Sequence, residues 1–282
     1  MQYDPVTQDQ VIIDKKQLPS MRAVTFNSSG SKLLGSLYLT GGKQLQPTVV
    51  LAHGFPGNEH NQDLAHAVRR AGFNVLIFHY RGSWGSEGVF SFSNSIEDII
   101  SAFEFVKSEK VCGNYNLDPK RVVFIGHSMG GFATFVNAEK LKGVNNLGFI
   151  AGFNFGVLAD LIKLPFAEEK VLEHLGAGAE MVAGTNAKKL LKEIVENKDR
   201  FNILNYVKAL SEKNLLMIAS KHDSTAMINF HHKPLMKAFK KHKLLREVII
   251  DGGHVFSTKR IELARCVVNW LNSIKFNETD AE

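Results

Sequence analysis

The sequence predicts an α/β fold, in which helices cover both faces of an open and mostly parallel sheet. Short apolar runs that do not alternate with polar residues favour strands buried on both faces. Patterns typical of amphipathic helices lie between the runs, and this alternation is characteristic of parallel sheets. The runs fall at residues 49–52, 75–78, 122–125, 215–219 and 248–250, and the helical patterns at residues 63–71, 95–107, 130–140, 232–243 and 259–274.

The composition is typical of a soluble globular protein. Of 282 residues, 44% are hydrophobic and 22% are charged, and a chain of this length can bury a large core without a disulfide or metal. The formal charge of +6 is too mild to predict nucleic-acid binding. Cys112 and Cys266 lie far apart without C-x-x-C spacing, so we expect reduced thiols and no metal site.

No targeting or membrane segment is expected. Asp4 stands where a secretory signal would be basic, and no segment approaches the roughly 20 apolar residues of a membrane span. The sequence therefore predicts a cytoplasmic protein, and it leaves the oligomeric state open.

The chain before the first parallel strand follows a different pattern. Residues 21–26 and 32–39 flank Asn27-Ser-Ser-Gly30, which is typical of a turn. We expect an antiparallel hairpin at the edge of the sheet.

The interval from residue 156 to residue 211 lacks a strand-like run. Helical pieces are predicted at residues 158–163, 168–174, 186–196 and 204–210, with a loop over residues 176–184. Leu190, Leu191, Ile194 and Val195 form one apolar stripe. The interval is therefore predicted to be a helical insertion packed on a core of residues 20–155 and 212–282, which an arm of residues 1–19 precedes.

A nucleophile motif lies where a predicted strand meets a predicted helix. Residues 126–130 read Gly-His-Ser-Met-Gly, a G-x-S-x-G sequence. Glycines at these positions let strand and helix approach closely while Ser128 adopts a strained turn. The Met129 amide at the start of the helix could then stabilise an oxyanion.

A nucleophilic serine needs a base and a group that orients the base. Asp223 and His254 each follow a later predicted strand. Carboxyl ends of parallel strands meet at one edge of the sheet, so Ser128, Asp223 and His254 can converge there. The chain order Ser, Asp, His differs from the orders in chymotrypsin and subtilisin.

These motifs resemble those of the α/β-hydrolases, over nearly all of residues 20–274. The resemblance implies an α/β-hydrolase fold with a small helical cap at residues 156–211, and a Ser128, His254 and Asp223 triad. Residues 53–57, His-Gly-Phe-Pro-Gly, are similar to the family's HG loop, which implies that the Phe55 N–H joins the Met129 N–H in an oxyanion hole. Residues 79–88 resemble an R-G-x-x-G segment of the prolyl-oligopeptidase and acylaminoacyl-peptidase branch.

One position departs from the family pattern. Many relatives carry a glycine three residues before the acid, where this chain has Ser220. Asp251 is therefore kept as a rival to Asp223, although its place three residues before His254 favours a role in bracing the loop.

The other histidines and glycines have simpler interpretations. His53 and His127 are expected to brace loops, and His222 to point away from the site. His231, His232 and His242 lie among lysines without zinc-ligand spacing, which favours a solvated helix face. The glycines at 82, 85 and 88 fit no nucleotide-binding motif, so neither a cofactor nor a metal is expected.

The leading hypothesis is a carboxylesterase that acts on small or medium acyl esters through an acyl-enzyme intermediate. The alternatives are a serine peptidase, a thioesterase, and a ligand-binding protein on a hydrolase fold. The expected partner is a small-molecule ester or related acyl compound. Apolar residues that could line an acyl pocket are Phe153, Phe155, Leu158, Leu161, Ile162, Leu164 and Phe166.

Overall fold

The computed structural model describes residues 3–12 and 14–276, and its centre is one eight-stranded sheet. The strand order is β1-β2-β4-β3-β5-β6-β7-β8. All pairs from β4 to β8 are parallel, and β2 runs antiparallel to both β1 and β4. The strands are β1 Ser20–Ser28, β2 Ser31–Leu39, β3 Gln46–Ala52, β4 Asn74–Phe78, β5 Leu117–His127, β6 Asn146–Ile150, β7 Asn214–Ser220 and β8 Leu245–Ile250. The mostly parallel α/β fold and the hairpin at the edge of the sheet are thus confirmed.

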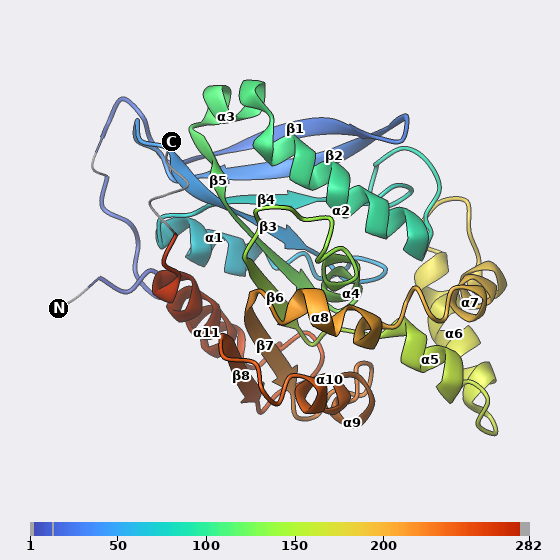
Figure 1. Ribbon diagram of the computed structural model, residues 1–282. Helices are drawn as coiled ribbons and strands as arrows, with labels where there is room; N and C mark the ends of the chain where they lie inside the picture. Colours follow the sequence, from blue (N-terminus) through green and yellow to red (C-terminus); the bar gives the residue numbers. More distant parts are fainter. Residues whose placement is uncertain (1–2, 13, 277–282) are drawn as a thin grey trace.

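Two apolar layers cover the sheet, one on each face. Side chains of α1 and α11 form the layer on one face, and those of α2 and α4 belong to the larger layer on the other. Figure 1 shows the segment before β1 and helix α11 on one side of the molecule and α5, α6 and α7 on the opposite side. The helices outside the β6–β7 connection are α1 Gln62–Arg70, α2 Phe92–Lys107, α3 Glu109–Tyr115, α4 Met129–Phe135, α9 Ile228–His231, α10 Lys233–Ala238 and α11 Arg260–Ser273.

The connection between β6 and β7 is helical. It contains α5 Phe155–Leu161, α6 Ala167–Ala179, α7 Ala187–Glu196, the 3-10 turn η1 Ile203–Tyr206 and α8 Val207–Leu210. Leu190, Leu191 and Ile194 are buried. Glu193 accepts hydrogen bonds from the Phe92 and Ser93 N–H groups, so a carboxylate sits at the positive end of α2 and ties α7 to the core.

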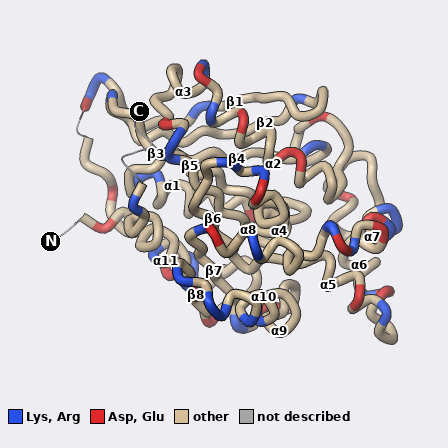
Figure 2. Tube along the Cα trace, viewed as in Figure 1, with Lys and Arg blue, Asp and Glu red and all other residues tan. Residues whose placement is uncertain are grey.

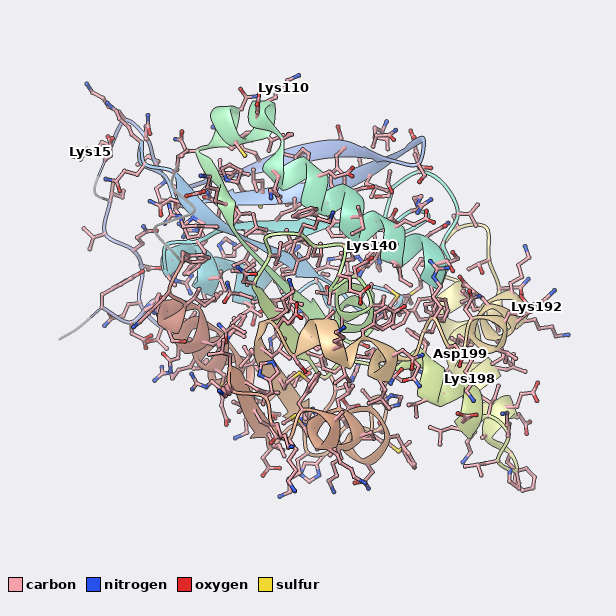
Figure 3. All side chains as sticks on the ribbon, viewed as in Figure 1. Lys15, Lys110, Lys140, Lys192, Lys198 and Asp199 are labelled. Atoms are coloured by element: carbon pink, nitrogen blue, oxygen red, sulfur yellow. The ribbon has the colours of Figure 1, made fainter. Side chains whose placement is uncertain are left out.

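The outer side of this connection carries charged residues. Lys198, which follows α7, pairs with Asp160 of α5 at 2.7 Å. Lys192 points away from the molecule, as Figure 3 shows. Val195 is 49% exposed, so its predicted place in the buried stripe is wrong.

Two strands differ from the prediction. β6 was not predicted from the sequence, because Gly148 interrupts its run of apolar residues. A Cβ at Gly148 would approach Ile125 of the neighbouring strand at 3.0 Å, so glycine there makes room in the sheet. β8 is the edge strand and is not buried on both faces, since Ile249 is 52% exposed.

Several helix boundaries were also wrong. α4 ends at Phe135 rather than at residue 140, and residues 232–243 form only the short α10 followed by turns. α6 continues to Ala179 through the glycines that predicted a loop from residue 176. Glycine lowers helix propensity, which is why the sequence predicted a loop there, but propensity is only a weak guide to where a helix ends.

Lys and Arg gather along α10 and β8, which Figure 2 shows at one edge of the molecule. Lys233, Lys237 and Lys240 of this segment are exposed, in agreement with a solvated face at these positions. Among the described residues, no helix is long and apolar enough to cross a membrane.

A buried ion pair joins the hairpin, the segment after β4 and α2. Arg81 Nε donates to Asp98 Oδ1 at 2.7 Å, and the side chains are 8% and 0% exposed. Asp98 also accepts from the Arg81 N–H and the Ser28 hydroxyl. Arg81 additionally pairs with Glu97, whose side chain is 52% exposed.

We predict that Asp98→Ala lowers the free energy of unfolding by about 3–5 kcal/mol, because the Arg81 guanidinium stays buried without its main partner. Glu97→Ala is the matched control, and its effect should stay within about 1 kcal/mol because solvent screens this pair. Urea unfolding of both variants measures the difference. Equal losses would contradict the prediction.

Candidate active site

Ser128 occupies a sharp turn between β5 and α4. Its φ is 55° and its ψ is −120°, a conformation that residues other than glycine rarely adopt. The Ser128 N–H donates to Ile150 O at 2.9 Å, and its carbonyl accepts from the Phe153 N–H at 3.2 Å. These bonds to β6 and the residues after it hold the strained turn in place.

Glycines make the turn possible. A Cβ at Gly126 would overlap backbone atoms of Gly130 and Gly131, and a Cβ at Gly130 would overlap the carbonyl of Ala52 in β3. Strand, helix and neighbouring strand therefore meet at a distance that side chains would prevent. The motif's glycines thus have the role that the sequence predicted for them.

His254 lies between Ser128 and Asp223. The structure has His254 Nε2 3.0 Å from Ser128 Oγ and His254 Nδ1 2.7 Å from Asp223 Oδ2. Because a carboxylate can only accept, Nδ1 carries the proton and Nε2 accepts from the serine hydroxyl. Three residues from the ends of β5, β7 and β8 therefore form one hydrogen-bonded series.

Asp223 is held as a carboxylate. Burial opposes its ionisation, but the hydrogen bonds from His254 and from the Ala226 and Thr225 N–H groups outweigh burial and lower the pKa of Asp223 below its usual value. The side chain is fully buried. An ionised acceptor is thus fixed behind the imidazole.

Asp251 lies away from this series. It is exposed and accepts from His222 Nε2 at 2.6 Å, so both residues brace the surface of the loop. Ser220, three residues before Asp223, is buried, and its hydroxyl donates to the Gly252 carbonyl. That bond ties the end of β7 to the loop that carries His254.

Phe55 and Met129 line the same cavity as Ser128. Met129 opens α4 directly after the serine. Phe55 follows Gly54, where a Cβ would come within 2.9 Å of Ser128 Cβ, so the loop after β3 passes close to the serine. The Phe55 ring packs against Phe90. It also occupies the space next to α6 that the missing side chain of Gly178 leaves open.

Two buried histidines brace the surrounding loops. His53 Nδ1 donates to Gly54 O at 2.7 Å, and His127 Nε2 donates to His254 O at 3.0 Å. Burial lowers the pKa of each to about 3, so both are neutral near pH 7. Their geometry agrees with loop bracing, and His127 fixes the backbone that carries His254.

A cavity of about 440 Å³ opens beside Ser128. Its walls come from the β6–β7 connection and from the segment after Asp223, and they are mostly apolar. The lining residues include Phe153, Phe155, Leu158, Leu161, Leu164, Val171, Leu175, Met227 and Phe230. Five of the seven expected pocket residues are among them, whereas Ile162 and Phe166 are not, and Phe166 is 80% exposed.

The prediction of a solvated histidine face was wrong for His231 and His232. Both are buried: His231 lines the cavity, and His232 pairs with Glu247 at 2.8 Å. The lysines that follow these histidines in the sequence indicated an exposed segment, so the burial of the two rings was not predicted. The cavity residues after Asp223 were not predicted from the sequence, and they are Ser224, Thr225, Met227, Phe230 and His231.

A family model matches the part of the chain that contains these residues. The model described as "Alpha/beta hydrolase family" matches residues 49–260. The uncharacterised protein YfhR of Escherichia coli strain K12 is 27% identical over 210 residues, which are 74% of this chain and 63% of that protein. The quorum-quenching protein AidA of Acinetobacter baumannii is 31% identical over 141 residues, 46% of this chain and 45% of AidA.

Solved structures share the fold at low identity. The esterase Pf2001 of Pyrococcus furiosus superposes with a TM-score of 0.66 and 20% identity, covering 90% of this chain and 91% of the esterase. An acylaminoacyl peptidase of Pyrococcus horikoshii gives a TM-score of 0.67 at 17% identity, covering 95% of this chain and 45% of the peptidase.

We predict opposite effects for two glycine substitutions in α6. Gly178→Ala places a methyl group against the Phe55 ring and should lower the free energy of unfolding by about 1–3 kcal/mol. Gly176→Ala is the matched control: its Cβ would meet Ala187 at 3.9 Å, so helix propensity should raise stability by up to about 1 kcal/mol. Denaturant unfolding measures both, and a stabilised Gly178→Ala would refute the proposed packing.

Acid should destabilise the fold through its neutral histidines. His53 has a pKa of about 3 in the fold, against about 6.5 in an unfolded chain, so below pH 6.5 the unfolded state binds the extra proton. The free energy of unfolding should therefore decrease as the pH is lowered from about 6.5 toward 3, and His53 should contribute up to about 1.4 kcal/mol per pH unit to this decrease. Denaturant unfolding measured between about pH 6 and pH 4 gives the free energy of unfolding as a function of pH, and its slope should be shallower for His53→Gln than for wild type. An unchanged slope would contradict the lowered pKa of His53.

Proposed function

Because the chain belongs to the alpha/beta hydrolase family, we propose that it is a serine hydrolase that cleaves carboxylic esters. The observation that supports this most strongly is the hydrogen-bonded series of Ser128, His254 and Asp223. The series joins a hydroxyl, an imidazole and a carboxylate, which are the groups that acyl transfer requires.

In the proposed mechanism His254 Nε2 takes the proton of Ser128 as Oγ attacks the ester carbonyl. Asp223 holds the imidazole in the reactive tautomer and stabilises the imidazolium. His254 then gives the proton to the leaving alcohol, and an acyl group remains on Ser128. A water molecule activated by His254 releases the acid and restores the serine.

The Phe55 and Met129 N–H groups are proposed to bind the oxyanion of the tetrahedral intermediates. Met129 is the first residue of α4, where helical N–H groups lack intrahelical partners. We propose that residues 156–211 act as a cap whose apolar side chains receive the organic part of the ester. The cavity beside Ser128 supports this assignment, because it would shelter the reacting carbonyl from water.

Labelling by a fluorophosphonate tests the nucleophile. Wild type should be labelled covalently, and Ser128→Ala should not be, because the substitution removes Oγ. Turnover of p-nitrophenyl acyl esters should fall by a factor on the order of a million in Ser128→Ala. An unlabelled wild type, or equal labelling of the variant, would exclude Ser128. Aminoacyl anilides turned over as fast as esters would instead favour a peptidase.

A pair of aspartate variants tests the acid. Asp223→Asn should lower kcat about ten-thousandfold, because an amide favours the wrong imidazole tautomer. Asp251→Asn is the matched control and should retain nearly full activity, since Asp251 contacts only surface groups. The reverse ranking would assign the acid to Asp251.

A further inference from the structure

The cavity wall carries a polar group that the proposed mechanism does not use. His231, at the end of α9, is 2% exposed and lines the same cavity as Ser128. Its ring stacks on Phe153, with the ring centroids 4.1 Å apart. A buried imidazole among apolar and aromatic neighbours needs partners for both of its nitrogens.

One of these nitrogens is accounted for. The Asn154 N–H donates to His231 Nδ1 at 3.1 Å. Asn154 is itself fixed, because its side chain accepts from the Ile203 N–H and donates to Asn202. Nδ1 must therefore be the unprotonated nitrogen, which leaves the proton of the neutral ring on Nε2.

The other nitrogen is free within the described part of the chain. No described residue makes a hydrogen bond to His231 Nε2, and the ring borders the cavity. Burial lowers the pKa of His231 to about 4, so the imidazole remains neutral near pH 7. The cavity is thus given one fixed N–H donor without a positive charge.

We propose that His231 Nε2–H binds a neutral oxygen of the substrate other than the scissile carbonyl. This inference rests on the proposed function and narrows it. The substrate class becomes carboxylic esters that carry an ether, hydroxyl or second carbonyl oxygen in the acyl or the alcohol part. A plain hydrocarbon in the cavity would leave the buried donor unpaired, at a cost in binding.

Matched pairs of esters test the proposal. In one series, the methylene groups at C3, C4 and C5 of a p-nitrophenyl hexanoate acyl chain are replaced by oxygen, one at a time, so that the scissile group remains a carboxylic ester. In the other, the methylene group at C3 of the alcohol part of butyl hexanoate is replaced by oxygen, which gives an ether in the alcohol part. The readout is the ratio of kcat/KM for each oxygen ester to kcat/KM for its methylene parent. Comparing this ratio between enzyme variants cancels the intrinsic reactivity of each ester.

Three variants separate the donor from its structural surroundings. His231→Phe removes both nitrogens. His231→Asn keeps an acceptor for the Asn154 N–H but does not reach the position of Nε2. His231→Gln carries an amide N–H on a longer side chain and is the rescue variant.

We expect at least one oxygen position at which the wild-type ratio exceeds that of His231→Phe and His231→Asn by about three- to tenfold. His231→Gln should recover part of this difference. A ratio that is the same in all four proteins at every position, or an equal loss on oxygen and methylene esters, would overturn the proposal. A wild type that hydrolyses none of these esters would instead refute the proposed function.

Discussion

The left-handed backbone at Ser128 is the constraint on which the site depends. Its φ of 55° turns the chain from β5 into α4 within one residue, and this is feasible only because Gly126 and Gly130 let three backbone segments touch. The turn exposes Oγ at the carboxyl edge of the sheet, where the ends of β7 and β8 bring Asp223 and His254. Bonds from Ser128 to β6 and the residues after it resist relaxation of the strain.

The helical connection between β6 and β7 packs against the loop that passes Ser128 at this edge of the sheet. Gly178 lies inside α6, yet its missing side chain leaves room for the Phe55 ring. Phe55 belongs to the loop that passes Ser128, so the position of α6 and the position of that loop depend on each other. Glu193 fixes the same connection to the first turn of α2. The connection that supplies much of the cavity wall therefore contacts the core through both α6 and α7.

Much of the fold was predictable, because buried parallel strands leave continuous apolar runs and the nucleophile turn needs glycines at fixed spacing. The failures have physical causes. β6 was not predicted because Gly148 interrupts its apolar run. In the fold this glycine makes room for Ile125 of the neighbouring strand and does not form a turn. The helix continues through Gly176 and Gly178 although glycine lowers helix propensity, and at Gly178 the missing side chain makes room for the Phe55 ring. His231 was assigned to solvent because its lysine neighbours are exposed, while its own ring turns inward.

The sequence by itself determined the α/β order of elements, the strand-to-helix turn at Ser128 and the three residue types that could meet at the sheet edge. It favoured Asp223 as the acid but kept Asp251 as a rival, since both precede His254 and follow apolar strands. Only the tertiary structure decided that Asp223 faces Nδ1 while Asp251 turns to His222 at the surface. The reason is that adjacent parallel strands bring their ends together across many residues, and the direction of each loop beyond the strand depends on contacts such as that of Ser220 with Gly252.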